Sequence, residues 1–340
     1  MRQDSLFWTS SKHLAELNAM GDPLEKLDKA IDWRMFEPML EKAFCKERKS
    51  NAGRPSYDYI LMFKILVLQH LYNLSDEQTQ YQILDCHSFR RFLGLGNEDQ
   101  VPDQKTVWLF RETLTQCGAV RKLFDKFDGY LSQAGYRAQK GQIVDAAFVE
   151  VPRQRNNRQE NDHIRNGSVP PHWKKKPAKL RQKDLDARWT KKNGQRHYGY
   201  KNHLNVDVKH KLIRNYQVTP ANVHDSQVFS RLEDKDNTGR GFWGDSAYRS
   251  LGIDRKLKRR GRKNNIQYKG CRNHPLTARQ KALNRLRSAV RARVEHVNER
   301  LDSMIGRWIR TIGIIRAQAR IGMTNLAYNL RRYAYLECRA

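Results

Sequence analysis

The spacing of apolar residues changes once along the chain, at Gly141, and this change limits the possible folds more than any other feature. Before Gly141, apolar residues recur every three or four positions, which predicts amphipathic helices joined by short connections. After it, residues 142–151 form a short apolar run rich in β-branched side chains, as in a buried strand. We therefore expect an all-α N-terminal domain at residues 1–135 and an α/β domain at residues 136–335.

The first domain carries the start signals of several helices. Helices are expected to start at or near Pro23, Tyr59, Ser75 and Pro102, and residues 51–55 form a break. The sequence Ser-Asp-Glu-Gln that begins at Ser75 matches a capping box. Short helices in a basic chain are typical of a helix-turn-helix DNA reader. A helical packing or dimerisation domain fits the same pattern, so both interpretations stay open.

The net charge of +29 favours a polyanionic partner, and nucleic acid fits best because counterion release drives its binding. A membrane partner is disfavoured, since the most apolar stretch, Ile60–Leu68, is interrupted by Lys64 and falls short of about 18 apolar residues. Residues 1–10 lack the apolar core of a signal peptide. The five cysteines show no CxxC spacing, which predicts reduced thiols and a cytoplasmic location.

The second domain is expected to form a mixed five-stranded sheet flanked by helices. Its first strand, at residues 142–151, is followed by a hairpin with a polar turn and then by alternating helices and short strands. The later strands are expected at residues 197–210, 211–219, 241–245 and 265–269.

Residues 152–190 are polar, contain proline and carry many Lys and Arg side chains. A segment of this composition is not expected to bury a core. We interpret it as an extended excursion between two strands that becomes ordered on a polyanion; a merely solvated loop is the alternative.

A long helix is expected at Leu283–Trp308, where apolar residues recur at three- and four-residue steps. Arg291 and Glu295 flank this apolar stripe and share one polar edge of the helix. Glu295 can form a structural ion pair with Arg291, or it can reach over the end of a sheet and bind a metal ion.

Two aspartates lie in the expected strands. Asp145 interrupts the apolar run at residues 142–151, and Asp245 ends the strand at residues 241–245. An aspartate in an apolar strand needs a partner, although Asp245 can also cap the helix that follows. Together with Glu295, these residues suggest a cluster of three carboxylates whose repulsion a divalent cation removes. Oxygen ligands suit Mg²⁺ or Mn²⁺, and two ions about 3.5–4 Å apart promote in-line phosphodiester displacement.

The order of these motifs resembles the DDE transposases of bacterial insertion sequences, in the group named after insertion sequence five. The resemblance covers roughly residues 20–330 and includes the helical region ahead of the catalytic domain. The segments that carry it are Arg54–Tyr57, Pro102–Asp103, Ile143–Ala146, Asp186–Lys192, His197–His203, Val218–Ser226, Gly244–Ser250 and Arg291–Val297.

The resemblance implies an RNase H-like catalytic domain with Asp145, Asp245 and Glu295 as its metal-binding triad. Asp145 is expected to bridge two Mg²⁺ or Mn²⁺ ions, and the other two carboxylates each favour one ion. Such an enzyme uses water to cleave DNA at the end of the element, and the freed 3′-OH then attacks target DNA. The alternatives are a nuclease of the same fold that does not join strands and a transposase-derived DNA-binding protein without catalysis.

The motif around Glu295 departs from the group in two places. The group usually has a Tyr three residues before the Arg that matches Arg291, and a Lys seven residues after the Glu. Those positions hold Ser288 and Asp302 here. Another cation must then hold the terminal phosphates, and Arg300 and Arg307 are the candidates.

The implied partners are the terminal inverted repeats and the target DNA, in the bacterial nucleoid. Because two ends must be cut together, a homodimer or larger assembly is expected on DNA. Trp189 and Trp243 either stack on a flipped base or pack in the core. The expected DNA contacts are Arg291, Lys201, His203, Lys174, Lys175, Lys176, Arg259, Arg260 and Arg262.

Overall fold

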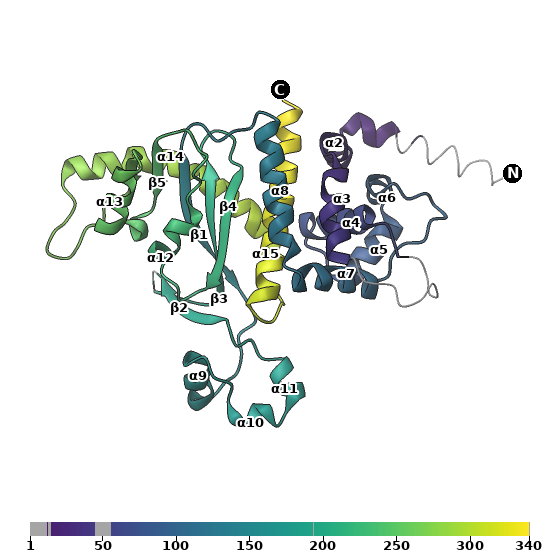
Figure 1. The fold of residues 1–340 in the computed structure, drawn as a ribbon, viewed down its shortest axis with the longest axis horizontal. Coiled ribbons are helices and arrows are strands. Elements are labelled where there is room, and N and C mark those ends of the chain that lie inside the picture. The colour runs from purple at the N-terminus through teal and green to yellow at the C-terminus, as the bar shows by residue number, and fades with distance from the viewer. Residues whose placement is uncertain (1–11, 13–14, 45–55, 193, 340) are drawn as a thin grey trace. The chain divides into compact units, whose positions relative to one another are not determined.

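The computed structural model describes residues 12, 15–44, 56–192 and 194–339 (Figure 1). By their internal contacts these residues form two compact units: those up to Phe127 together with those from Leu326 onward, and Asp128–Asn325. The last residues of the chain thus group with the N-terminal helices, whereas the sequence placed residues up to 335 with the sheet. The break expected at residues 51–55 lies outside the described residues.

The first unit is helical, as expected, and its predicted helix starts are confirmed. The helix α4 begins at Tyr59, and Asp103 caps α7 directly after Pro102. Ser75 and Gln78 form the predicted capping box, in which each side chain accepts a hydrogen bond from the other residue's backbone N–H. The elements are α2 (Pro23–Ala30), the 3-10 helix η1 (Trp33–Phe36), α3 (Glu37–Phe44), α4 (Tyr59–Leu71), α5 (Asp76–Asp85), α6 (His87–Leu93), α7 (Gln104–Gln116) and parts of α8 (Ala119–Gln133) and α15 (Ile314–Glu337).

The second unit contains a mixed sheet of six strands, in the order β2-β3-β1-β5-β6, with β4 paired to β3. Strand β1 runs antiparallel to β3 and parallel to β5. The expected count of five was wrong because β2 was missed: this strand is polar and mostly exposed, so it shows no apolar alternation. The strands are β1 (Gln142–Glu150), β2 (Arg188–Lys192), β3 (Gln195–Asp207), β4 (Ile213–Pro220), β5 (Gly241–Gly244) and β6 (Lys263–Ile266).

Gly141 lies where β1 passes close to β5. A Cβ atom at this position would lie 2.4 Å from the carbonyl oxygen of Gly241, and the φ angle of Gly141 is +98°. Both features require glycine. The residue at which the apolar period changes is therefore also one that allows the two strands to pair. Beside them, α12 (Asp225–Leu232) and α13 (Leu251–Arg259) contribute Phe229 and Leu257 to one apolar core.

The basic segment at residues 152–190 folds, contrary to the expectation of an extended excursion. It forms α9 (Arg158–Arg165), α10 (Pro171–Lys174) and α11 (Pro177–Arg181), which Figure 1 shows as a small lobe beyond β2 and β3. Its centre is the fully buried Trp173, whose indole N–H donates to buried Glu160 at 2.7 Å. Lys179 pairs with the same carboxylate at 3.2 Å. One tryptophan and one shared acceptor thus order a segment whose composition predicts no core.

The predicted long helix exists as α14 (Ala278–Ile305), but its apolar stripe is shorter than expected. The helix ends at Gly306, so Trp308 lies outside it. Leu286 is 69% exposed, and the buried apolar residues all lie in the second half of the helix. The helix packs against β1 and β5. Its first half also bonds β6, because Arg287 donates to the carbonyl oxygen of Ile266 at 2.7 Å. Within the described part of the chain, no helix is long and apolar enough to cross a membrane.

Candidate active site

Asp145 and Asp245 follow directly after paired residues on neighbouring parallel strands. Val144 of β1 lies opposite Gly244 of β5, so the next residue on each strand is an aspartate. The carboxyl ends of parallel strands are common sites for ligands. Asp245 also caps the 3-10 helix that follows it, because one of its oxygens accepts the N–H of Ala247 at 3.0 Å. Asp245 therefore caps this helix and also lies beside Asp145.

The negative charge of Asp145 is only partly compensated by the cations around it. Burial raises its pKa to about 6, and the neighbouring charge of Asp245 adds to the rise, while Arg291 acts in the opposite direction. Its Oδ2 accepts a hydrogen bond of 2.8 Å from the amide nitrogen of Asn298 on α14. A partly buried carboxylate beside a second carboxylate is a setting that favours a divalent cation.

Glu295 lies on the helix that packs against these two strands, but its side chain points to solvent. It is 61% exposed and pairs with Arg291 at 3.1 Å. Arg291 also donates to Gln267 at 3.2 Å. Among the described residues, no three His, Cys, Asp or Glu side chains are already grouped as a metal site. The structure thus brings two of the three predicted carboxylates together and holds the third in the ion pair that the sequence left open.

Asn298 is a site residue to which the sequence assigned no role. It lies three residues after Glu295 and seven after Arg291, so the three share one face of α14. Its Oδ1 is buried and has no hydrogen-bond partner among the residues that the structure describes, and the same is true of the hydroxyl of Tyr248. The charges of Asp145 and Asp245 both act on Tyr248, so this hydroxyl lies near them. Unpaired buried oxygen atoms beside two carboxylates fit a cation-binding site.

Lys201 and His203 do not line a DNA-binding surface, which corrects the sequence expectation. The ammonium group of Lys201 is buried and bonds Asp225 and the carbonyl of Val223, each at 2.8 Å. His203 is fully buried, and burial lowers its pKa to about 4, so the ring is neutral. Its Nε2 lies 2.9 Å from the hydroxyl of Thr219. Both side chains lie on β3 and are covered, so neither can contact phosphate in this structure.

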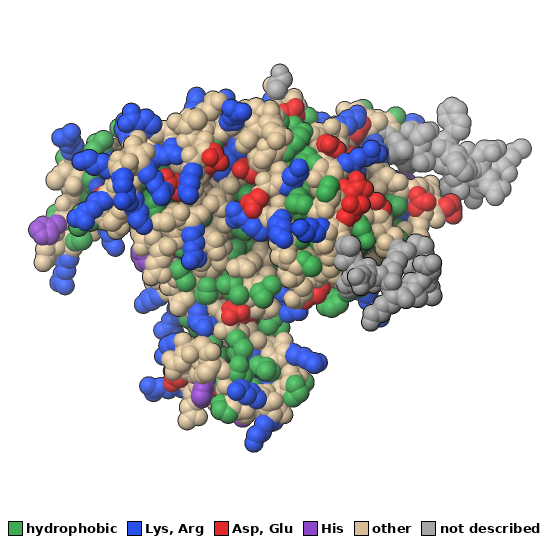
Figure 2. Space-filling view, in the orientation of Figure 1, with side chains coloured by type: hydrophobic (Ala, Val, Ile, Leu, Met, Phe, Trp, Pro, Cys, Tyr) green, Lys and Arg blue, Asp and Glu red, His purple; other side chains and the backbone are tan. Residues whose placement is uncertain are grey.

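The other predicted DNA contacts divide into exposed and structural residues. Arg260 forms an ion pair with buried Glu233, and Arg262 donates to the carbonyls of Asn237 and Gly239, so both arginines serve the fold. Arg260 is 40% exposed despite its ion pair, and the other exposed side chains of this set are Lys174, Lys175 and Lys176 on the lobe and Arg259 on α13. Figure 2 shows Lys and Arg side chains spread over the lobe and around α13.

The two tryptophans considered for base stacking differ in their surroundings. Trp243 is half-buried, and its ring lies so close to Gly241 that a Cβ atom there would be 2.0 Å from it. This ring is therefore part of the strand packing. Trp189 is 46% exposed, lies 4.9 Å from the ring of Tyr198 and has the Arg153 guanidinium 5.5 Å from its centroid. Of the two, Trp189 has the accessible ring face.

Two family models match this chain. Residues 12–113 match the model described as Transposase domain (DUF772), and residues 136–330 match the one described as Transposase DDE domain. Among solved structures, the chain is similar to a piggyBac transposase in a synaptic complex with hairpin DNA, at 14% identity and a TM-score of 0.46, over 92% of this chain and 75% of that one. Since the second family model covers more than half of the sequence, the chain belongs to the family of DDE transposases, the enzymes of DNA transposition.

Proposed function

We propose that this DDE transposase cuts DNA at the ends of an insertion sequence and joins the freed 3′-OH to target DNA, with Asp145, Asp245 and Glu295 as its metal-binding residues. We further assign it to the group named after insertion sequence five and its sheet domain to the RNase H-like fold. The mixed sheet and the order of the acidic motifs support these assignments.

The observation that carries the proposal is the pairing of Val144 with Gly244, after which Asp145 and Asp245 follow at neighbouring positions of two inner strands, β1 and β5. Burial and the neighbouring charge of Asp245 raise the pKa of Asp145 to about 6 although Arg291 and Lys192 act to lower it, so the nearby cations do not fully compensate this carboxylate. A structural aspartate would instead have a buried cationic partner, as Asp225 has in Lys201.

The carboxylate oxygens of Asp145, Asp245 and Glu295 are ligands that suit Mg²⁺ or Mn²⁺. Asp145 and Asp245 would hold the ions together with Glu295. Two such ions, when bound, activate the attacking oxygen and offset the charge on the leaving oxygen of the phosphodiester. The protein's own residues set the position: β1 and β5 fix the two aspartates, and Asn298 orients Asp145 through its 2.8 Å hydrogen bond.

Arg291 controls the third carboxylate in this proposal. It pairs with Glu295 at 3.1 Å, and its charge also acts on Asp145. Turning Glu295 away from Arg291 and toward the aspartates completes the triad and frees the guanidinium. The freed group then contacts a DNA phosphate, for which a planar guanidinium is well suited.

The DNA is proposed to run across the exposed cations of the second unit. Lys174, Lys175 and Lys176 lie on the folded lobe, and Arg259 lies on α13. Neutralising the three lysines should weaken DNA binding and reduce the dependence of log K on log salt by about 1 for each phosphate that the lysines no longer neutralise. An unchanged salt slope would remove the lobe from the DNA path. A dimer or larger assembly on paired ends is part of the same proposal.

A cleavage and joining assay tests the function. The substrate is a labelled duplex that ends in the inverted repeats flanking the reading frame, with a supercoiled plasmid as target and Mg²⁺ or Mn²⁺ present. Asp145→Asn, Asp245→Asn and Glu295→Gln should each abolish cleavage and leave DNA binding intact. Glu299→Gln, an exposed carboxylate on the same helix, is the matched control. Cleavage without joining by the unaltered protein would favour the nuclease alternative, and full activity of Glu295→Gln would remove Glu295 from the triad.

A further inference from the structure

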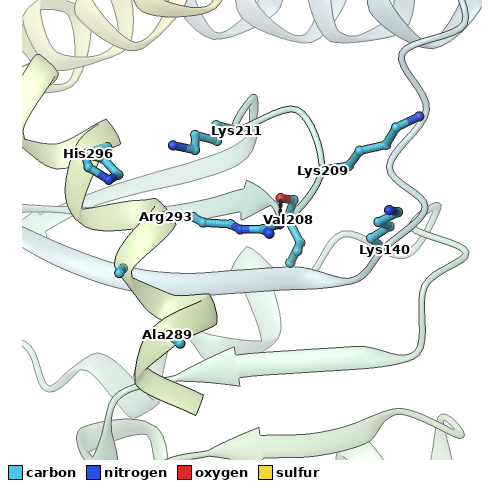
Figure 3. Close-up of a pocket in the computed structure, with 8 residues that line it drawn as sticks. Lys140, Val208, Lys209, Lys211, Ala289, Arg293 and His296 are labelled. Atoms are coloured by element: carbon cyan, nitrogen blue, oxygen red, sulfur yellow. Dashed lines mark hydrogen bonds between the residues drawn. The ribbon is translucent and has the colours of Figure 1, made fainter. Parts of the chain in front are cut away.

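A second, basic site lies in the unit that contains the sheet. It is a pocket of about 480 Å³ between α14, the β3–β4 turn and Lys140, two residues before β1 (Figure 3). None of its lining residues is acidic. They are Lys140, Val208, Lys209, Lys211, Ala289, Ala292, Arg293 and His296.

This pocket and the candidate active site use different faces of α14. At 100° per residue, Arg293 and His296 are turned by roughly 100–160° from Glu295. Asn298 faces Asp145, whereas Ala289 and Ala292 face the pocket, and their small side chains leave it open. The basic pocket is therefore separate from the candidate active site at Asp145 and Asp245.

The cations of the pocket are held in place by buried contacts. Arg293 donates to the carbonyl oxygen of Val208 at 2.6 Å, as Figure 3 shows, which fixes its guanidinium across the pocket. The β3–β4 turn is anchored by Asp207, which is fully buried and accepts the backbone N–H groups of Lys209 and His210. Its carboxylate also lies 3.1 Å from the ring of His210. The lysines on this turn thus stand on a rigid backbone.

Lys211 keeps an unfavourable backbone conformation. Its φ angle is +59°, in the left-handed region that glycine and asparagine adopt most readily. In Figure 3 its side chain extends toward His296. A lysine in this region of φ is uncommon, and such positions often occur at functional sites.

We propose that this pocket binds a backbone phosphate of duplex DNA at a position other than the scissile one. The inference rests on the proposed function, and it adds a DNA contact on the side of α14 away from the carboxylates. Four cationic side chains with no acidic residue in the lining, an oriented guanidinium and a turn anchored by Asp207 all suit a phosphate group. The basic pocket would hold the duplex in register while the candidate active site acts on another phosphate.

The test measures duplex binding by the full-length protein in EDTA, so that no cleavage occurs. The variant Lys211→Asn with Arg293→Gln removes two charges from the pocket. The control, Lys122→Gln with Lys126→Gln, removes two charges from the exposed side of α8. The pocket variant should bind about 10-fold or more weakly, and its salt slope should fall by about 1–2, because one or two phosphates are no longer neutralised. The control should change less than about 3-fold.

Two further measurements locate the bound phosphate and exclude unfolding. Lys211→Asn alone should melt at or above the wild-type temperature, since asparagine tolerates the left-handed conformation; a lower melting temperature would contradict the strain argument. In duplexes with single neutral methylphosphonates, the pocket variant should lose its defect at one or two adjacent non-scissile positions. If the pocket variant instead lost its binding defect with the neutral linkage at the scissile position, the proposal would be overturned.

The outcomes also separate this inference from the proposed function. A wild-type protein that neither binds nor cuts the end duplex contradicts the function itself. A wild-type protein that binds and cuts, with a pocket variant equal to the control, contradicts the pocket alone. Protection from heat by inorganic phosphate or a nucleotide that depends on Lys211 and Arg293, with duplex binding unchanged, would reassign the pocket to a small anion.

Discussion

The substitution Asp145→Asn should stabilise the metal-free protein while it abolishes cleavage. Asp145 is partly buried beside Asp245, and this environment raises its pKa from 3.8 to about 6. Ionising this carboxyl group at neutral pH therefore costs free energy in the folded state that is absent in the unfolded chain. Asparagine has nearly the same shape and carries no charge, so the cost disappears.

The size of the effect follows from the pKa shift. A rise from 3.8 to about 6 corresponds to roughly 3 kcal/mol of destabilisation when the group is ionised. The variant also weakens the bond from Asn298, because a charged acceptor becomes neutral, which offsets about 1 kcal/mol. We expect a net gain of about 1–2 kcal/mol in the free energy of unfolding, or about 2–8 °C in melting temperature for a unit of this size.

The gain should depend on pH in a defined direction. Below about pH 3 the carboxyl group is protonated in both states, so the gain should vanish and the variant should be no more stable than the wild type. Between about pH 4 and 6 the unfolded chain releases its proton first, and the wild type loses stability as pH rises. Above about pH 6 the difference should be constant.

Urea denaturation in EDTA at pH 5 and pH 8 measures this difference, with Glu299→Gln as the control carboxylate on α14. The variant should gain more at pH 8 than at pH 5, and the control should change little at either. Addition of Mg²⁺ should stabilise the wild type and leave Asp145→Asn unaffected, because only the wild type holds the ion. Equal stability of wild type and variant at pH 8 would refute the electrostatic description of this site.

Three further changes test other parts of the structure. Glu160→Leu leaves the buried indole N–H of Trp173 without its acceptor and should cost about 1–3 kcal/mol; hydrogen exchange should show weaker protection in α9–α11 but not in β1. Gly199→Ala forces a Cβ atom to within 2.3 Å of the carbonyl oxygen of Val149 at a φ of +145°, so thermal unfolding should show a loss of about 2 kcal/mol or more. Asn298→Leu should weaken Mn²⁺ binding by about 10-fold or more in calorimetry, whereas Asn284→Leu, on the same helix, should not.

The sequence predicted the helical first unit and most of the sheet because capping residues and apolar periods report local structure directly. Ser75 and the strand around Asp145 are examples. The edge strand β2 was not predicted because an exposed strand needs no apolar alternation. The folded lobe was not predicted because the composition of the segment does not show that one tryptophan is buried. The capping box of Asn157 and Glu160, however, can be read in the sequence.

The candidate site was predictable in its residues and less so in its surroundings. The expectation that Lys201 and His203 contact DNA was wrong. The helix α12 packs on β3 from one side, and Asn325 bonds Asn202 of the same strand, so polar side chains of β3 are buried as well. Burial of this kind depends on which helices return to cover the strand, and no local pattern reports it.

The most direct test of the proposed metal site is a Mn²⁺ titration of the full-length protein, followed by electron paramagnetic resonance. The wild type should bind two ions per chain, and Asp145→Asn should bind none. Asp245→Asn and Glu295→Gln should each lose one ion, and Glu299→Gln should match the wild type. Two ions retained in Asp145→Asn, or in Glu295→Gln, would contradict the proposed three-carboxylate site.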